Sequence, residues 1–406
     1  MNRKYMVLLG DGMADCPIAE LEGKTPLQAA RTPNLDRLAQ QGKLGLVRTV
    51  PPGLPPGSDV ANLSIFGYDP ALYFTGRAPL EAAAMGVRLD PDDVAFRCNL
   101  LTLSGREGNA LMDDFSAGHI STEEARQIIV DVGKALGNEE FQFYPGVSYR
   151  HLLVWRHGTK SLSLTTTPPH DITGKAVAEY LPQGEGRQEI CGLMGGAQKI
   201  LQSHPVNRKR QESGKKPANA IWLWGQGKAP SLTPITQRFS LQGSVISAVD
   251  LMKGIGFYAG LEMINVPGAT GYLDTNYAGK AEYALREIAR KDFVYVHVEA
   301  PDEASHNGNR KDKIQAIEDF DGKIVGPILR GLKKHKNFRL LVLPDHPTPL
   351  ALRTHSSEPV PFVIFSSEDN GRVSKKEQFF DELSASRAGL FIERGHELLE
   401  KFIEGF

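Results

Sequence analysis

The chain has 406 residues, of which 41% are hydrophobic and 23% charged, and its formal net charge is −1. A chain of this length can bury a large core, and we expect a globular protein of two domains. The near-zero charge offers no field for nucleic acid or an anionic membrane, and no apolar stretch approaches the roughly 20 residues that span a bilayer. Nucleic acid and membrane are therefore not expected as partners, while the oligomeric state stays open.

The cysteines indicate the compartment. Cys16, Cys98 and Cys191 are far apart in the sequence and odd in number, which suits a reducing environment. Their spacing excludes a disulfide framework and a cysteine-based zinc site. The N-terminus runs directly into a strand pattern without the features of a signal peptide. We expect a cytoplasmic protein.

The first elements end in polar residues. A short apolar run at 5–9 predicts a strand that stops at Gly10-Asp11-Gly12. A helix is predicted at 33–41, since proline is favoured at the first helical position. Residues 51–57 hold four prolines and two glycines, so they form a stiff loop that presents Ser58 at the start of a helix-like stretch, 59–66.

The middle of the chain, 88–216, has a pattern of its own and predicts an inserted α+β domain. A helix begins at the capping box Ser121-Thr-Glu-Glu124. The predicted strands of this domain are 95–103, 141–144 and 149–155. The metal-binding core domain would then comprise 1–87 and 217–406.

The C-terminal part alternates between strands and helices. Buried strands are predicted at 292–299, 338–343 and 360–365. A long helical pattern at 311–334 carries apolar residues on one face, and Pro327 predicts a kink in it. Strands that alternate with helices indicate an α/β fold with a mostly parallel sheet and helices on both faces.

Seven polar residues stand at or near the ends of apolar runs, where an open parallel sheet keeps its active site. They are Asp11, Ser58, Asp302, His306, Asp345, His346 and His355. Three carboxylates, three imidazoles and a hydroxyl would suit two divalent metal ions and one nucleophile. Ligands of this type fit manganese, zinc, cobalt or magnesium and do not choose among them.

The local spacing supports this interpretation. Asp302 and His306 are four residues apart, so one helical turn would place them on the same face. Asp345 and His346 are adjacent and would point to opposite sides of a strand, so the chain must turn there if both bind metal. Ser58 is a poor nucleophile at neutral pH unless a metal activates its hydroxyl.

Together with further motifs, these residues resemble the archaeal-type 2,3-bisphosphoglycerate-independent phosphoglycerate mutases of the alkaline phosphatase superfamily. The motifs that carry the resemblance lie at 10–15, 23–27, 56–64, 67–70, 75–81, 116–121 and 169–175 and around the C-terminal Asp and His residues. The resemblance implies an alkaline-phosphatase-like sheet. It also assigns one metal ion to Asp302, His306 and His355 and the other to Asp11, Asp345 and His346. Manganese is the first candidate for these ions.

The resemblance further implies an isomerase of glycolysis and gluconeogenesis that interconverts 3-phosphoglycerate and 2-phosphoglycerate through phosphorylated Ser58. The inserted domain would hold the substrate, a small phosphorylated hydroxy acid. The candidate substrate-binding residues are Lys280, Arg77, His119, Arg150, His151, His170 and Asp171. Two alternatives share the same site: transfer to another small hydroxy acid such as homoserine, and phosphomonoester hydrolysis. A kinase that binds ATP through a P-loop is not expected, because that motif is absent from the sequence.

Overall fold

The computed structural model describes residues 3–105, 109–369 and 377–405. The chain forms two compact units, which we call unit 1 (residues 1–74 and 231–406) and unit 2 (residues 75–230). The described part of the chain contains no helix that is both long enough and apolar enough to cross a membrane.

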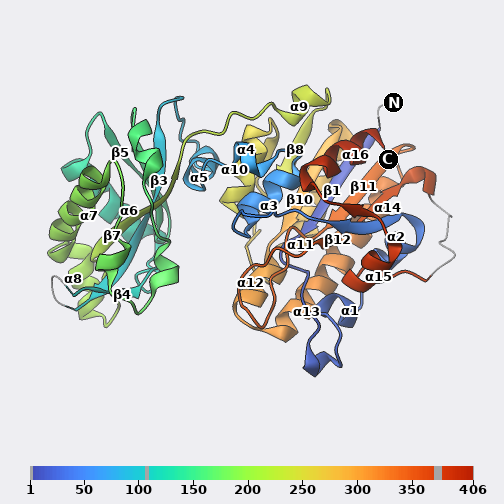
Figure 1. The fold of residues 1–406 in the computed structure, drawn as a ribbon, viewed down its shortest axis with the longest axis horizontal. Helices are drawn as coiled ribbons and strands as arrows, with labels where there is room; N and C mark the ends of the chain where they lie inside the picture. Colours follow the sequence, from blue (N-terminus) through green and yellow to red (C-terminus); the bar gives the residue numbers. More distant parts are fainter. Residues whose placement is uncertain (1–2, 106–108, 370–376, 406) are drawn as a thin grey trace. The chain divides into compact units, whose positions relative to one another are not determined.

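Unit 1 is built on an eight-stranded sheet with the strand order β13-β2-β12-β11-β1-β10-β8-β9 (Figure 1). Strand β12 is antiparallel to both of its neighbours, and the other neighbouring pairs are parallel. The strands are β1 (Lys4–Gly10), β2 (Lys43–Val47), β8 (Gly243–Ile246), β9 (Glu262–Ile264), β10 (Phe293–Val298), β11 (Phe338–Leu343), β12 (Val360–Ser366) and β13 (Phe391–Ile392). The predicted α/β class with a mostly parallel sheet is confirmed.

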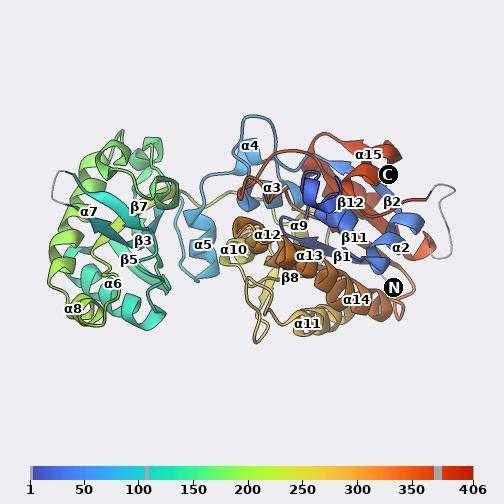
Figure 2. The ribbon, with the colours of Figure 1, turned by 90° about the horizontal axis from the view of Figure 1, so that it is seen from below.

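Helices cover both faces of this sheet (Figures 1 and 2). On one face, the buried side chains of α2, α11, α13, α14 and α15 form one core with alternate residues of the central strands. The opposite face is covered by α3, α10 and α16, and Tyr5 of β1 packs there against Phe402. The helices of unit 1 are α1 (Pro26–Ala29), α2 (Pro33–Gln41), α3 (Ser58–Ile65), α4 (Pro70–Tyr73), α9 (Ile235–Arg238), α10 (Asp250–Tyr258), α11 (Tyr277–Arg290), α12 (Ala300–His306), α13 (Arg310–Asp319), α14 (Gly326–Leu332), α15 (Glu382–Ala388) and α16 (Leu398–Glu404).

The long helix predicted at 311–334 is divided by a wider turn. A π-helical segment, Phe320–Val325, joins α13 to α14, and Pro327 lies in the first turn of α14. A proline ring clashes with the carbonyl of the residue four positions earlier, and a π-helical turn changes that pairing. The structure therefore has a π-helical segment just before the proline where the sequence predicts a kink.

Unit 2 is a smaller α+β unit. Its antiparallel sheet has the order β4-β3-β6-β5, and β7 also pairs with β3. The strands are β3 (Val94–Ser104), β4 (Leu111–Asp114), β5 (Phe141–Val147), β6 (Arg150–Trp155) and β7 (Ala220–Gly227), and the helices are α5 (Ala78–Ala84), α6 (Thr122–Leu136), α7 (Arg187–Gln202) and α8 (Pro205–Glu212).

The boundaries of the insertion differ from the predicted 88 and 216. Helix α5 packs on β3 and β6 through Ala78 and Ala82, and the run at 220–227 forms β7 within the unit 2 sheet rather than a strand of the core domain. Sequence alone misses both, since an apolar run does not reveal which sheet it joins.

Candidate metal and phosphoryl-transfer site

Potential metal ligands gather at one edge of the unit 1 sheet, where β1, β10 and β11 end. Asp11 directly follows β1, and Asp345 and His346 come just after β11. Asp302 and His306 lie on α12, which begins shortly after β10. Because these strands are parallel neighbours, their carboxyl ends meet at the same edge.

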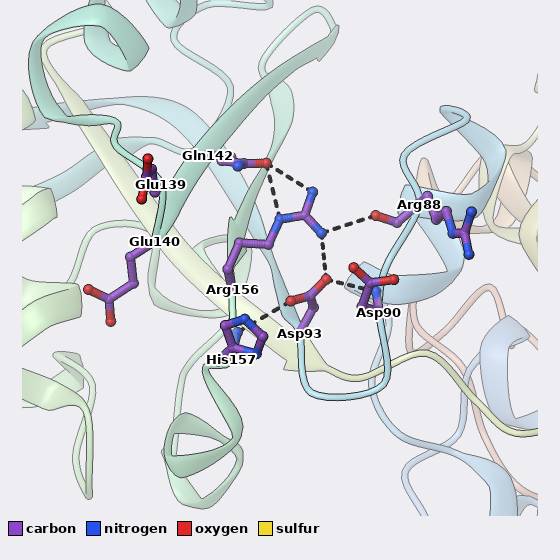
Figure 3. A pocket seen from close by; sticks show the side chains of 8 residues that line it. All are labelled: Arg88, Asp90, Asp93, Glu139, Glu140, Gln142, Arg156 and His157. Atoms are coloured by element: carbon purple, nitrogen blue, oxygen red, sulfur yellow. Dashed lines mark hydrogen bonds and ion pairs between the residues drawn. The ribbon is translucent and has the colours of Figure 1, made fainter.

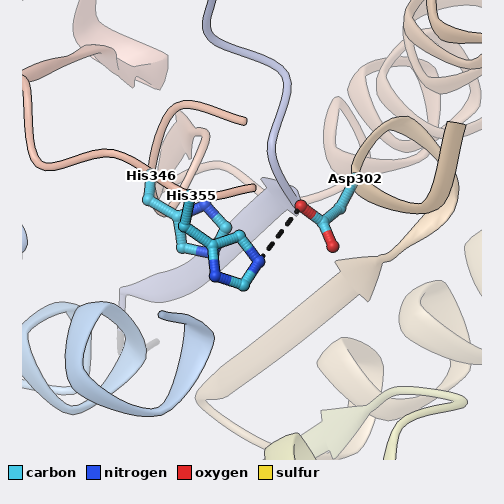
Figure 4. A group of neighbouring side chains, drawn as sticks. All are labelled: Asp302, His346 and His355. Atoms are coloured by element: carbon cyan, nitrogen blue, oxygen red, sulfur yellow. Dashed lines mark ion pairs between the residues drawn. The ribbon is translucent and has the colours of Figure 1, made fainter. Parts of the chain in front are cut away.

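The first predicted set comes together. His306 Nε2 lies 3.1 Å from Asp302 Oδ2 and 3.0 Å from His355 Nε2. His355, which lies in the loop before β12, has its Nε2 3.6 Å from Asp302 Oδ1. Figure 4 shows His346 beside His355, with ring centroids 4.2 Å apart, and the group that could hold a metal ion here consists of Asp302, His355 and His346, with His346 in the place predicted for His306. His346 thus lies between the two predicted sets.

The second predicted set is fully buried. His346 Nε2 lies 3.6 Å from Asp11 Oδ1 and 3.5 Å from Asp345 Oδ2. The chain bends at Asp345 and His346, so both side chains reach the same side. Ser58, the first residue of α3, has its Oγ 3.2 Å from His346 Nε2. The predicted nucleophile is therefore within hydrogen-bond distance of a predicted metal ligand.

Close backbone approach holds these loops in place. Gly12 has φ +61°, and a Cβ there would lie 2.6 Å from both Asp302 Oδ1 and Thr348 Oγ1, so only glycine fits without a shift. Its N–H donates to Asp345 Oδ1 at 3.1 Å. Thr348 Oγ1 donates to Asp302 Oδ1 at 2.6 Å and lies 3.2 Å from His346 Nδ1. Thr348 thereby links the two predicted sets and leaves Nε2 of His346 facing the cluster.

Asn62, one helical turn after Ser58, also supports the site. Its Nδ2 donates to the Ser58 carbonyl at 2.8 Å and to Asp345 Oδ2 at 2.9 Å. Its Oδ1 accepts from the Tyr295 hydroxyl at 2.6 Å. The start of α3 is thus tied to the Asp345 loop through a buried amide.

The electrostatics of this cluster are dominated by buried carboxylates. Burial raises the pKa of Asp11 well above its ordinary value, and the charges of Asp345, Glu299 and Asp302 raise it further. Burial and Asp302 raise the pKa of Glu299 to about 8. Burial alone would also raise the pKa of Asp302, but hydrogen bonds with His306 and His355 hold that pKa well below the usual range.

This arrangement fits divalent cations. Four carboxylates crowd into one buried region, and a charge buried in that way must be paired or bind a metal. Asp11 Oδ1 has no hydrogen-bond partner among the described residues although it is buried. Imidazole nitrogens and carboxylate oxygens within 4.8 Å of one another complete the donor sets. The chain therefore carries residue clusters suited to divalent metal ions.

A buried lysine fastens two of the loops. Lys313 of α13 is fully buried, and its Nζ donates to Asp15 Oδ2 at 2.8 Å, to the Thr348 carbonyl at 2.9 Å and to the Ala14 carbonyl at 3.3 Å. The loop after β1 and the loop after β11 are thereby held to the same helix.

We expect Lys313→Met to destabilise unit 1 by about 3–5 kcal/mol, because removing one partner leaves the buried Asp15 carboxylate unpaired. All three tryptophans, Trp155, Trp222 and Trp224, lie in unit 2. In urea, tryptophan fluorescence should therefore follow unit 2 and stay unchanged, while far-UV circular dichroism should show an earlier transition. Lys311→Met, an exposed change on the same helix, is the control. An unshifted dichroism curve for Lys313→Met would contradict this role.

Unit 2 contains a group of arginines around one carboxylate. Glu81 Oε1 lies 3.2 Å from Arg77 Nε, and its Oε2 lies 2.9 Å from Arg97 Nε. Burial would raise the pKa of Glu81, but Arg97, Arg77 and Arg150 together lower it. Burial lowers the pKa of Arg97 to about 10. Three guanidinium groups therefore gather around the carboxylate of Glu81.

Aromatic rings connect this group to the other candidates in unit 2. The Arg97 guanidinium lies 4.3 Å from the Trp224 ring centroid, and the His170 ring lies 5.5 Å from Trp224. The rings of Phe115 and Tyr149 continue the series, with His119 6.3 Å from Tyr149 and the Arg150 guanidinium 5.3 Å from it. We call Arg77, Glu81, Arg97, Trp224, His170, Phe115, Tyr149, His119 and Arg150 the arginine–aromatic series.

Three predicted substrate-binding residues are placed differently. His151 is buried on β6, its Nδ1 accepts from the Gly146 N–H at 2.9 Å, and burial lowers its pKa to about 3. Adjacent strand residues point to opposite faces, so His151 cannot share the direction of Arg150. Asp171 is exposed. Lys280 belongs to unit 1, where its buried Nζ donates to the His297 carbonyl at 3.0 Å and burial lowers its pKa to about 8.

Unit 2 also has an open hollow of about 950 Å³, shown in Figure 3. Arg156 Nη1 lies 2.5 Å from Asp93 Oδ2, and its Nη2 donates to Gln142 Oε1 at 2.9 Å. The lining residues are Arg88, Asp90, Asp93, Glu139, Glu140, Gln142, Arg156 and His157, and none of them is a predicted site residue. Since its central charges pair with each other, we assign no chemistry to this hollow.

Several residues near the cluster were missed in the sequence. His297 and Glu299 form a further potential metal group with Asp11, and burial lowers the pKa of His297 to about 3. A signal was present for His297, because Tyr295 and His297 occupy alternate positions of the otherwise apolar strand Phe-Val-Tyr-Val-His-Val. Asn62 lies within the 56–64 motif but was not singled out, and Thr348 gave no signal, since a threonine in a loop is common.

The comparisons with known proteins agree on one family. A family model described as 2,3-bisphosphoglycerate-independent phosphoglycerate mutase matches residues 39–207. A curated protein of Geobacter sulfurreducens with the name "Probable 2,3-bisphosphoglycerate-independent phosphoglycerate mutase" is 56% identical over 99% of this chain and 100% of its own length. The enzyme named without "probable" in Methanosarcina barkeri is 54% identical over 98% of each chain.

Solved structures show the same fold. A protein of Pyrococcus horikoshii, 31% identical, aligns with a TM-score of 0.82 over 100% of this chain and 97% of its own. A cofactor-independent phosphoglycerate mutase of Thermoplasma acidophilum, 27% identical, aligns with a TM-score of 0.66 over 99% of each chain.

Proposed function

We propose, because this chain belongs to the 2,3-bisphosphoglycerate-independent phosphoglycerate mutase family, that it interconverts 3-phosphoglycerate and 2-phosphoglycerate through a phosphoserine at Ser58. The observation that carries the proposal is the position of Ser58 Oγ, 3.2 Å from His346 Nε2 at the edge of the carboxylate and imidazole cluster. It is a half-buried hydroxyl at the start of a helix, where backbone N–H groups can receive phosphate oxygens.

In this proposal, Ser58 Oγ attacks the phosphorus of 3-phosphoglycerate. The bond from phosphorus to the substrate oxygen breaks as the bond to Ser58 forms, and the 3-hydroxyl leaves with a proton. The 2-hydroxyl of the retained glycerate then attacks the phosphorus, the bond from phosphorus to Ser58 Oγ breaks, and Ser58 regains a proton as the 2-hydroxyl loses its own. No phosphate is exchanged with water in either step.

We assign one metal ion to Asp302, His306 and His355 and the other to Asp11, Asp345 and His346. Ser58 would be a further ligand of the second ion. When bound, divalent ions supply positive charge that stabilises the phosphoryl oxygens and the ionised serine. Manganese is our first candidate; imidazole and carboxylate donors without thiolate fit it, as they also fit zinc, cobalt and magnesium.

Unit 2 is proposed to hold the glycerate. The support is the gathering of Arg77, Arg97 and Arg150 around Glu81, since arginine binds carboxylates through paired N–H groups. Arg77, Arg150, His119 and His170 are the predicted residues within this series. Lys280 stays a proposed phosphate-binding residue of unit 1, and a cytoplasmic location stays a prediction.

The test is an assay of the metal-supplemented enzyme with 3-phosphoglycerate, run beside O-phosphohomoserine plus glycerate. We expect 2-phosphoglycerate as the main product, with little free phosphate. Transfer from phosphohomoserine at a higher kcat/KM would favour the related phosphotransferase, and free phosphate as the main product would favour a phosphomonoesterase.

A further inference from the structure

Asp11 presents only one of its two carboxylate oxygens to the metal cluster. Its Oδ1 faces His346 Nε2 at 3.6 Å and has no hydrogen-bond partner among the described residues. Its Oδ2 points the other way, to His297 Nε2 at 2.8 Å. The side chains of Asp11 and His297 are both completely buried, so water does not compete for this contact.

The hydrogen bonds around His297 define its tautomer. His297 Nδ1 lies 3.1 Å from the hydroxyl of Ser247, a buried residue just after β8. The same hydroxyl oxygen accepts the Val249 N–H at 3.0 Å. If Ser247 donates its hydroxyl proton to Nδ1, the proton of the neutral imidazole is on Nε2 and is donated to Asp11 Oδ2. When Asp11 is ionised, as a metal ligand must be, the other tautomer would make Nε2 and a carboxylate oxygen face each other as two acceptors, which is unfavourable in a buried site.

The backbone places His297 beside the Asp11 loop. In the parallel pairing of β1 with β10, His297 lies opposite Leu9, and the Asp11 N–H donates to the Val298 carbonyl at 2.9 Å. Tyr295, two residues earlier, lies on the same face of the strand and supports Asp345 through Asn62. One face of β10 therefore supports two predicted ligands of the same metal ion.

We infer that Ser247 and His297 form a hydrogen-bonded relay that positions Asp11, so that Oδ1 is fixed toward the metal. The inference rests on the proposed function, since it takes Asp11 as a metal ligand. His297 is here a positioning residue rather than a ligand. Groups of this kind fix the orientation of a ligand, and their loss weakens metal affinity by roughly 10–100-fold.

The test measures metal binding rather than turnover. The full chain is freed of metal with a chelator and titrated with Mn²⁺ by calorimetry, and bound metal is counted by mass spectrometry. His297→Met removes the donor, while His297→Gln keeps an N–H that can reach Asp11. Ser247→Ala removes the hydroxyl that sets the tautomer. Ser244→Ala is the matched control, because Ser244 is a buried serine of β8 that bonds to Glu287 instead.

We expect His297→Met to weaken one of two Mn²⁺ sites by roughly 10–100-fold. His297→Gln should recover most of that loss, Ser247→Ala should weaken the same site to a smaller extent, and Ser244→Ala should match wild type. Equal Mn²⁺ affinity in His297→Met and wild type would overturn the relay, as would a Gln variant as weak as the Met variant.

Two further results are separable from these. Three metal ions in wild type that fall to two in His297→Met would make His297 a ligand in a group with Asp11 and Glu299, and would overturn its positioning role. Wild type that binds no Mn²⁺ would reject the proposed metal site itself. Should His297→Met fail to fold, unchanged Mn²⁺ affinity in Ser247→Ala would still overturn the relay.

Discussion

Ser58→Ala should lower the rate of phosphoryl transfer by about 10⁴-fold or more, because a nucleophile that forms a covalent intermediate has no substitute once its oxygen is removed. The nearest other hydroxyl on α3 is that of Ser64, which is fully buried and donates to the Thr49 carbonyl at 2.5 Å. Metal binding should persist in the variant, since Asp11, Asp345 and His346 remain.

The direct measurement is an acid-quenched reaction of wild type with 3-phosphoglycerate, followed by peptide mass spectrometry. Phosphate should appear on the peptide that contains Ser58. Ser64→Ala makes the same chemical change on the same helix and should keep most of the activity. Phosphate on Ser64 or Thr75, or normal turnover by Ser58→Ala, would move the nucleophile and reject the proposed mechanism.

Removal of metal should have a comparably large effect. We expect chelator-treated protein to be inactive and to regain activity with Mn²⁺, because the buried carboxylates of Asp11, Asp302 and Asp345 repel one another without a cation and the phosphoryl group loses its electrostatic stabilisation. Elemental analysis should find about two metal ions per chain.

The same metal should raise the thermal stability of the protein, since a cation that binds the folded state shifts the unfolding equilibrium. Circular dichroism melting of metal-free and reloaded protein measures this shift. Chelator already saturated with Mn²⁺ is the control and should leave activity and melting unchanged. Full turnover in protein shown to be metal-free would contradict the two-metal proposal.

The sequence predicted the α/β fold and the gathering of the seven polar residues because both depend on local patterns. Strand ends are marked by glycine and proline, and a separation of four residues places Asp302 and His306 on one helical turn. The family resemblance was also correct. The division of the ligands between the two metal ions was harder to predict from the sequence. His346 lies close to both sets, and only three-dimensional distances show this.

Residues that act through another residue were harder to find. Thr348, Asn62 and His297 reach the site through hydrogen bonds between segments far apart in the chain. No periodicity of the sequence indicates such a contact. The predicted boundary of the inserted domain differs from that of unit 2 for a related reason. The pairing of β7 with β3 is a tertiary contact that the apolar run at 220–227 does not reveal.

The position of β1 in the sheet bears on how the protein is made. Strand β1 leaves the ribosome before the other strands of its sheet, yet its two neighbours in that sheet, β10 and β11, come late in the chain. At about 5–20 residues per second, this apolar strand waits roughly 15–60 s for a neighbour. Unit 2 is a continuous segment and can fold within that interval. The nascent chain should therefore carry a finished unit 2 beside an unpaired β1, a species that chaperones would recognise before the metal ligands can meet.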